Sequence, residues 1–390
     1  MRKIYSLMVM ALLVLSVMPG VFAVSTGDGI TPDITTEDFP PMVWACDDRV
    51  VWDDNTEPGR LEGSRYEECI ETSSYEECAE YLYERMNNYA FEGEKIAWDV
   101  LVMDKNGIEK IEDVFATIGD VQGEGNDIEV NCILDKIVDD ETDIDSSCNA
   151  RILEEEITSL PDNVAAYYTC ILTVETAESM YGEYWITVEA TDLDGLSGTM
   201  DENEYWFLNP AIALTIDGDL AFDNVRPGTS SYSDTLLIGN DADAGSGVRL
   251  DMFISGTDFY DSSSSGAKCP TSNQLVLGDG DSHCEDGDPF CYYATHGAYA
   301  TGGTNGGWGP DPRADAEGYV GIDYGIGFNN PNLFYNGYEI MQSGPMNFGY
   351  FQSNILSPGA EMAVTFRLNL PEPCNGDFDT GSIYFWGEAI

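Results

Sequence analysis

The stretch NPAIALTIDGDLAFDNVRPGTSSYSDTLLIGNDAD, residues 209–243, joins two runs of predicted β-strands. Ile212, Leu214 and Ile216 alternate along it, as the buried face of a strand requires. Asp-Gly and Pro-Gly pairs then supply two turns, with a short strand predicted at 222–225 between them. Because one strand ends at about Leu208 and the next begins at Ile212, the joint has almost no spare residues. The stretch therefore predicts a short, stiff seam between two β modules.

The upstream half of the chain has the same period of two. Alternating apolar residues predict strands at several places: Ile96, Trp98, Val100 and Val102; Tyr168, Cys170, Leu172 and Val174; Tyr184, Ile186, Val188 and Ala190. Turn sequences such as Asp104–Gly107 separate them. Many short strands with regularly spaced turns predict a mainly β fold of two tandem β-sandwich modules, immunoglobulin-like or jelly-roll-like.

One helical excursion interrupts this pattern near the N-terminus. Ser73 or Ser74 can cap a helix in which Cys78, Leu82 and Met86 follow a helical period. Residues 24–45 read as an extended lead or edge strand, and 46–63 as a loop. Four segments are predicted: a signal peptide at 1–23, an extended segment plus helix packed on the first module at 24–90, an immunoglobulin-like sandwich at 91–210, and a second sandwich with long Gly/Asp-rich loops at 211–390.

The N-terminus has the pattern of an export signal. Arg2 and Lys3 precede an apolar run over 4–18, and the small residues Val21 and Ala23 occupy the positions that signal peptidase reads. We expect cleavage after Ala23 and a mature chain at the cell surface or outside the cell, with no transmembrane segment.

Ten cysteines fit an oxidising compartment. Six precede residues 209–243 and four follow, so each module can close its own disulfides. The predicted set is Cys46, Cys69, Cys78, Cys132, Cys148, Cys170, Cys269, Cys284, Cys291 and Cys374. Expected pairs are Cys69–Cys78, Cys284–Cys291, Cys132–Cys170 and Cys269–Cys374. Zinc is the alternative, but there is no CxxC spacing and the histidines are only His283 and His296.

The charge is extreme, with 71 acidic residues against 16 basic ones. Such a surface repels nucleic acid and anionic lipid, so neither is an expected partner. Two explanations remain open. The acids keep the protein soluble, including at high salt, or some of them bind calcium.

Two acidic clusters are candidate calcium sites, because calcium takes several hard oxygen ligands on a flexible loop. The first contains Asp279, Asp281, Glu285, Asp286 and Asp288. The second lies at the seam and contains Asp192, Asp194, Asp217 and Asp219, with Asp241 and Asp243 nearby. The first does not have the ligand spacing of an EF-hand. Solvated loop acids and turn-forming Asp residues explain the same patterns without a metal.

Binding of sugars is a further possibility in the aromatic stretch 319–351. Its candidate rings are Tyr324, Phe328, Phe334, Tyr335, Tyr338, Phe348 and Tyr350, although such residues also form sandwich cores. No catalytic residues are predicted, since GxSxG, HExxH and a phosphate-binding loop are all missing from the sequence.

Several stretches resemble known surface proteins. WDVLVMDKNGIEKIEDV at 98–114 and YWITVEATDLDGLSGT at 184–199 resemble immunoglobulin-like modules of cell-surface proteins. Tyr168, two residues before Cys170, is similar to a tyrosine corner, but Trp98 precedes both Cys132 and Cys170, unlike the antibody pattern. The opening of the second module is similar to that of TasA/camelysin-type fibre proteins.

A likeness over most of the chain is to uncharacterised archaeal secreted surface proteins. It rests on residues 209–242, on LDMFISGTDFYD at 250–261 and on LPEPCNGDFDTGSIYFWGEAI at 370–390. These resemblances imply a surface location and no known activity. We therefore expect a structural surface protein, an envelope or surface-layer-like component or a fibre subunit, that pairs with itself or other surface proteins through terminal strands at 24–45 and 382–390. The alternatives are an adhesion or glycan-binding module and, more remotely, a secreted hydrolase.

Overall fold

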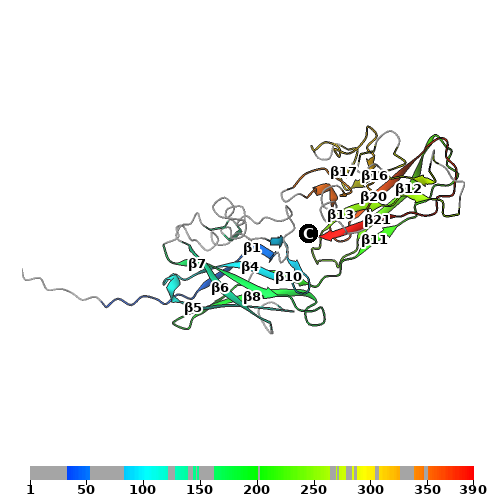
Figure 1. Cartoon of the computed structure of the whole chain (residues 1–390). Coiled ribbons are helices and arrows are strands. Elements are labelled where there is room, and N and C mark those ends of the chain that lie inside the picture. Colours follow the sequence, from blue (N-terminus) through cyan, green and yellow to red (C-terminus); the bar gives the residue numbers. More distant parts are fainter. Residues whose placement is uncertain are drawn as a thin grey trace, which may run out of the picture. The chain divides into compact units, whose positions relative to one another are not determined.

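The structure is a computed structural model that describes residues 33–52, 83–121, 128–138, 144–145, 147–148, 162–200, 203–263, 269, 272–277, 283–284, 288–303, 307–325, 338–346 and 350–390. The chain divides into two units, 1–38 and 39–390, and the strands that the structure describes lie in the second. The fold is mainly β, with several sheets (Figure 1). Among the described residues, no helix is long and apolar enough to cross a membrane.

Residues 42–208 form one ten-stranded sheet. Its strands are β1 (Met42–Trp52), β2 (Tyr83–Arg85), β3 (Tyr89–Ala90), β4 (Lys95–Met103), β5 (Ile111–Gly119), β6 (Ile128–Val138), β7 (Ala165–Thr173), β8 (Gly182–Asp192), β9 (Ser197–Thr199) and β10 (Tyr205–Leu208). The short 3₁₀ helix η2 (Ile108–Lys110) leads into β5. The order is β2-β1-β4-β7-β6-β5-β8-β10-β3, with β9 beside β8, and only the β10–β3 pair is parallel.

The sheet folds over its own apolar face. The alternating residues of β4, Ile96 to Val102, share one core with inward residues of β5 and β8, several strands away in the order. Trp98 and Trp206 lie at its centre, with ring centroids 6.4 Å apart. A Cβ at Gly198 in β9 would overlap the carbonyl of Pro41 just before β1, so the two sides of the sheet meet there. One continuous sheet thereby makes both layers of a sandwich.

A second, smaller core covers the outer face of β1, β4 and β7. Leu101 and Met103 of β4 are buried there, together with Val138 and Ile144. The disulfide Cys46–Cys148 joins β1 to this covering segment. Every residue of β4 after Lys95 is therefore buried, because both of its faces are packed.

Residues 214–389 form three further sheets. Their strands are β11 (Leu214–Asp217), β12 (Thr229–Asn240), β13 (Leu250–Gly256), β14 (Phe259–Tyr260), β15 (Gln274–Leu275), β16 (Phe290–His296), β17 (Tyr299–Ala300), β18 (Val320–Gly321), β19 (Ile355–Leu356), β20 (Glu361–Leu370) and β21 (Ile383–Ala389), and the 3₁₀ helix η6 (Gln352–Asn354) precedes β19. The orders are β11-β12-β20-β16-β17, with β18 beside β16; β19-β13-β21; and β14-β15.

The first two of these sheets pack on each other through one core. Inward residues of β12, β16 and β20, such as Ile238, Tyr292 and Phe366, meet Met252 and Ile254 of β13. Only residues 209–213 separate β10 from β11. That short joint agrees with the spacing predicted from the sequence, and the division into two modules at 210 remains our proposal.

The structure contains three of the predicted disulfide pairs: Cys132–Cys170, Cys269–Cys374 and Cys284–Cys291. Cys46–Cys148 is a fourth that the sequence left open. Cys69 and Cys78 lie outside the described residues. Cys132 and Cys170 are register partners on adjacent strands of one sheet, whereas the immunoglobulin disulfide joins two sheets. The resemblance to immunoglobulin modules therefore does not extend to their disulfide.

The expectations for residues 24–63 and for the helix are partly wrong. Residues 42–45, expected as part of an extended lead or edge strand, and residues 46–52, expected as a loop, together form β1, which lies between β2 and β4 and not at the edge of the sheet. Residues 83–85, expected at the end of the helix, form β2, and a bend follows. The rest of the predicted helix lies outside the described residues. Residues 222–225, predicted as a short strand, have no strand structure.

Candidate functional site: the acidic loop and the tyrosines around Arg367

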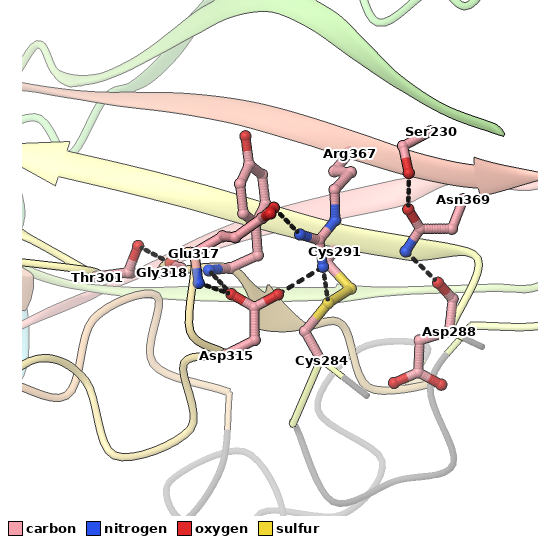
Figure 2. Close-up of a disulfide and its surroundings, with 11 residues drawn as sticks. Ser230, Cys284, Asp288, Cys291, Thr301, Asp315, Glu317, Gly318, Arg367 and Asn369 are labelled. Atoms are coloured by element: carbon pink, nitrogen blue, oxygen red, sulfur yellow. Dashed lines mark hydrogen bonds and ion pairs between the residues drawn. A yellow bond between two sulfur atoms is a disulfide. The ribbon is translucent and has the colours of Figure 1, made fainter. Parts of the chain in front are cut away.

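The disulfide Cys284–Cys291 attaches the acidic loop, the segment 279–288 that carries the first predicted acidic cluster, to the sheet. Cys291 is the second residue of β16 and lies opposite Arg367 of β20. The alternation of β16 turns Phe290 and Tyr292 into the core, which leaves Cys291 on the outer face. Figure 2 shows the disulfide beside the Arg367 side chain.

Arg367 is the centre of the polar contacts on this face. Its Nη2 lies 2.6 Å from Asp315 Oδ2 and its Nη1 lies 2.9 Å from Glu317 Oε2 (Figure 2). Nη2 also contacts Cys284 Sγ at 2.8 Å, and the guanidinium lies 4.3 Å from the centre of the Tyr319 ring. The arginine is 7 % exposed, so its charge is balanced by these carboxylates and not by water.

Asp315 is held ionised by the turn that it closes. Its Oδ1 accepts the backbone N–H groups of Glu317 and Tyr319, and its own N–H donates to the Tyr319 carbonyl. Burial disfavours the charged form, but these bonds and the Arg367 guanidinium outweigh it, so the pKa of Asp315 lies below its usual range. Its contribution to stability is therefore present above the ordinary pKa and is lost as pH falls through the lowered one.

A second set of bonds anchors the C-terminal end of the acidic loop, at Asp288. The Ser230 hydroxyl of β12 donates to Asn369 Oδ1, and Asn369 Nδ2 donates to the backbone carbonyl of Asp288 (Figure 2). The Asn369 N–H also donates to the Pro289 carbonyl. The loop is thus tied to β20 by an asparagine and to β16 by a disulfide.

The first predicted calcium cluster falls mostly outside the described residues. Asp279, Asp281, Glu285 and Asp286 are among the residues that are not described, and only Asp288 is described. Within the described part of the chain, no three acidic, histidine or cysteine side chains gather in a way that could hold a metal. Calcium on this loop therefore stays a prediction.

Calcium on the loop can be tested by replacing Asp279, Asp281, Asp286 and Asp288 with alanine. If the loop binds calcium, the variant should lose about 3 kcal/mol of unfolding free energy when free calcium is about a hundredfold above its Kd. The two proteins should unfold alike in chelator. Thermal melts provide the comparison, with exposed Asp223→Ala as control. Equal destabilisation with and without calcium would contradict the site.

The second predicted cluster separates into individual turns. Asp192 is 2 % exposed, and its Oδ1 accepts the N–H groups of Asp194 and Leu196, which closes the β8–β9 turn. Asp194 pairs with Lys110 at 2.9 Å. These contacts explain Asp192 as a residue that closes a turn and Asp194 as the ion-pair partner of Lys110, without a metal.

The remaining seam acids show no common site among the described contacts. Asp217 and Asp219 are exposed on either side of Gly218, whose φ is 114°. Asp243 Oδ2 accepts the Ala211 N–H and the Tyr181 hydroxyl, so this carboxylate helps to fix the joint. Calcium at the seam remains a prediction with no contact in the structure that supports it.

The described residues of the predicted aromatic stretch do not form an exposed row of rings. Tyr338 is buried and donates to the Tyr324 carbonyl, while Tyr324 is 54 % exposed. Phe328, Phe334, Tyr335 and Phe348 lie outside the described residues, and Tyr350 is half-buried.

Three other tyrosines come together next to Arg367 instead. The Tyr319 ring lies 6.0 Å from Tyr232 and 5.7 Å from Tyr293, between ring centroids. Tyr232 and Arg367 are register partners although 135 positions apart, a proximity that only strand pairing reveals.

No family model and no curated protein matches the chain. Solved structures with low similarity to the chain include the following two. One is titled "BspA_C_WT", with 9 % identity and a TM-score of 0.28, and the match covers 88 % of this chain and 96 % of that one. The other is the C-terminal domain of the AgI/II polypeptide BspA of Streptococcus agalactiae, with 10 % identity, a TM-score of 0.27, and 90 % and 97 % covered.

Proposed function

We propose that this protein is an exported structural component of the cell surface whose copies associate through the outer edge of β21. The observation that carries the proposal is the position of β21 at the end of the sheet β19-β13-β21. The export pattern of residues 1–23 and the four disulfides support a location in an oxidising, extracytoplasmic compartment.

The inner neighbour β13 is paired on both sides. Its other edge contacts β19, and the Ile254 and Gly256 N–H groups donate to the carbonyls of Tyr338 and Asp323. In the described part of the chain, no strand pairs with the outer edge of β21. A strand at the edge of a sheet presents unpaired backbone groups on which another strand can add.

The hydrogen-bond alternation identifies the backbone groups that point outward. At the two ends of the β13–β21 pair, Thr257 N–H donates to the Ser382 carbonyl and Ile390 N–H donates to the Arg249 carbonyl. Even-numbered residues of this strand therefore bond to β13, because antiparallel pairs alternate. The outward N–H and C=O groups belong to the odd-numbered residues Ile383, Phe385, Gly387 and Ala389.

Side-chain burial agrees with an open edge. All seven residues of β13 are buried, whereas all seven of β21 are partly exposed. Yet both faces of β21 are covered, since Phe385 packs on the main core and Trp386 packs against Phe253 and Tyr338. The remaining exposure therefore lies along the edge. The strand also has neither lysine nor proline, the residues that commonly block such edges.

A strand from a second copy is the partner that we propose. The sequence predicts a terminal strand within residues 24–45. Residues 42–45 of that range belong to β1, so the segment that could pair with β21 of a second copy is 24–41. Residues 33–38 of that segment are exposed and without regular structure. A net charge of −55 makes copies repel one another, so association should strengthen as salt shortens the screening length.

Proline at Ala389 tests the edge, because Ala389 has an outward N–H that proline lacks. Ala389→Pro should abolish self-association in sedimentation velocity at high salt. The strand of the second copy would lose the hydrogen bond from the Ala389 N–H, and it would clash with the proline ring. Ala389→Ser keeps the N–H and is the matched control. Both variants should melt within a few degrees of the wild type. Association of the proline variant equal to that of the serine variant would refute the proposed edge.

A further inference from the structure

The outer face of the sheet that contains β12, β20 and β16 has an unusual composition for so acidic a chain. Inward residues of these strands form the core, so the alternate residues face outward. The paired outward positions are Ser230, Tyr232, Thr235, Leu237 and Gly239 on β12; Asn369, Arg367, Thr365, Ala363 and Glu361 on β20; Cys291, Tyr293 and Thr295 on β16. Glu361, at the first position of β20, is the one acid among these paired positions, although the chain has 71 acidic residues.

We call Tyr232, Tyr293 and Tyr319 with their neighbours Thr235 and Thr365 the tyrosine face. Tyr232 is 54 % exposed, and the two threonine hydroxyls lie 3.2 Å apart at the surface. The rings are tilted by 47° and 54° to one another, so they do not stack face to face and cover each other.

The rings are held in place from behind. Gly302 and Gly318 approach each other and the Tyr293 ring so closely that a Cβ on Gly318 would come within 2.8 Å of Tyr293 Cε2. Arg367 lies against one side of Tyr319 and is fixed by two carboxylates. Rigid aromatic rings lose little conformational entropy when they bind a ligand.

The chemistry of this face fits a neutral saccharide. Sugar rings place C–H groups on aromatic rings, and their hydroxyls bond to side-chain hydroxyls such as those of Thr235 and Thr365. The positive charge of Arg367 is balanced by Asp315 and Glu317, so it does not recruit an anion. The net charge of −55 repels acidic polysaccharides over a longer range.

We propose that the tyrosine face binds neutral polysaccharide, with Tyr232 as the exposed ring that contacts the sugar. This is independent of the association through β21, which involves a different sheet. The site also differs from the aromatic stretch 319–351 predicted from the sequence, because only Tyr319 belongs to both.

The experiment measures binding of the mature chain to soluble amylose, laminarin, mannan and polygalacturonate by isothermal titration calorimetry. At least one of the three neutral polymers should bind, and Tyr232→Ala should weaken that binding about tenfold. Tyr232→Phe keeps the ring and should bind within about twofold of the wild type. Tyr324→Ala is the matched control, since Tyr324 has the same exposure of 54 % but lies outside the tyrosine face.

Three results would overturn the proposal. They are binding of none of the neutral polymers, equal binding by Tyr232→Ala and the wild type, and binding of polygalacturonate as tight as that of the best neutral polymer. Thermal midpoints of the variants, measured in parallel, show that a loss of binding does not reflect unfolding. A negative result here leaves the edge association untouched, because Ala389→Pro is scored by sedimentation.

Discussion

Replacing Arg367 with methionine is expected to lower the unfolding free energy by about 2–4 kcal/mol. The change keeps the length of the side chain but removes the guanidinium from the partly buried Asp315 carboxylate, which then keeps only its bonds to the Glu317 and Tyr319 N–H groups. Because Arg367 itself is buried, this loss should exceed that of an ion pair at the surface. Chemical denaturation of the mature chain at neutral pH measures the effect.

The control for this prediction is Arg226→Met, since Arg226 is exposed and should change stability by less than about 1 kcal/mol. The pH dependence gives a second readout. The pKa of Asp315 is lowered in the folded wild type, so its stabilisation is complete above the ordinary value of about 4 and is lost below it. Without Arg367 this part of the acid dependence should shrink. A loss no greater than that of Arg226→Met would show that Arg367 does not hold this face together.

Removing the disulfide Cys46–Cys148 should have an effect of similar size. The bond closes a loop with a sequence separation of 102, for which the chain-entropy argument gives about 4–5 kcal/mol. Serine at both positions therefore should lower the denaturation midpoint strongly, and the second core over β1 and β4 should loosen first.

The matched comparison is the pair of serines at Cys284 and Cys291, whose separation is only 7. The same argument gives about 2–3 kcal/mol for so short a loop. The long disulfide should therefore cost about 2 kcal/mol more than the short one. Equal losses would mean that chain entropy does not determine the effect of these bonds.

The strands that the sequence predicts well are those with an unbroken period of two. Ile96 to Val102 alternate without interruption and form the inner face of β4. Strand β1 was not predictable in this way, because its register shifts between Ala45 and Arg49. That irregularity breaks the alternation and places Asp47 and Asp48 in the middle of the strand, where their charges suggest a loop.

The contacts around Arg367 could not be predicted from the sequence for a different reason. Tyr232, Tyr319 and Arg367 come from three separate segments, and only the pairing of β12 with β20 brings the first and last together. A local window of sequence carries no signal of such a contact. In the second half, Cys269–Cys374 is the pair that remains once the short pair Cys284–Cys291 is assigned. In the first half the sequence left several pairings open, and the pairing of β6 with β7 is what brings Cys132 and Cys170 together.

The most direct test of the proposed function is amide hydrogen exchange along β21, before and after association. In dilute protein at low salt, the outward amides of Ile383, Phe385, Gly387 and Ala389 should exchange much faster than those of Tyr384, Trp386 and Glu388, which bond to β13. In concentrated protein at high salt, the four outward amides should become protected. Association without a change in those four amides would contradict the account, and so would protection already present in the monomer.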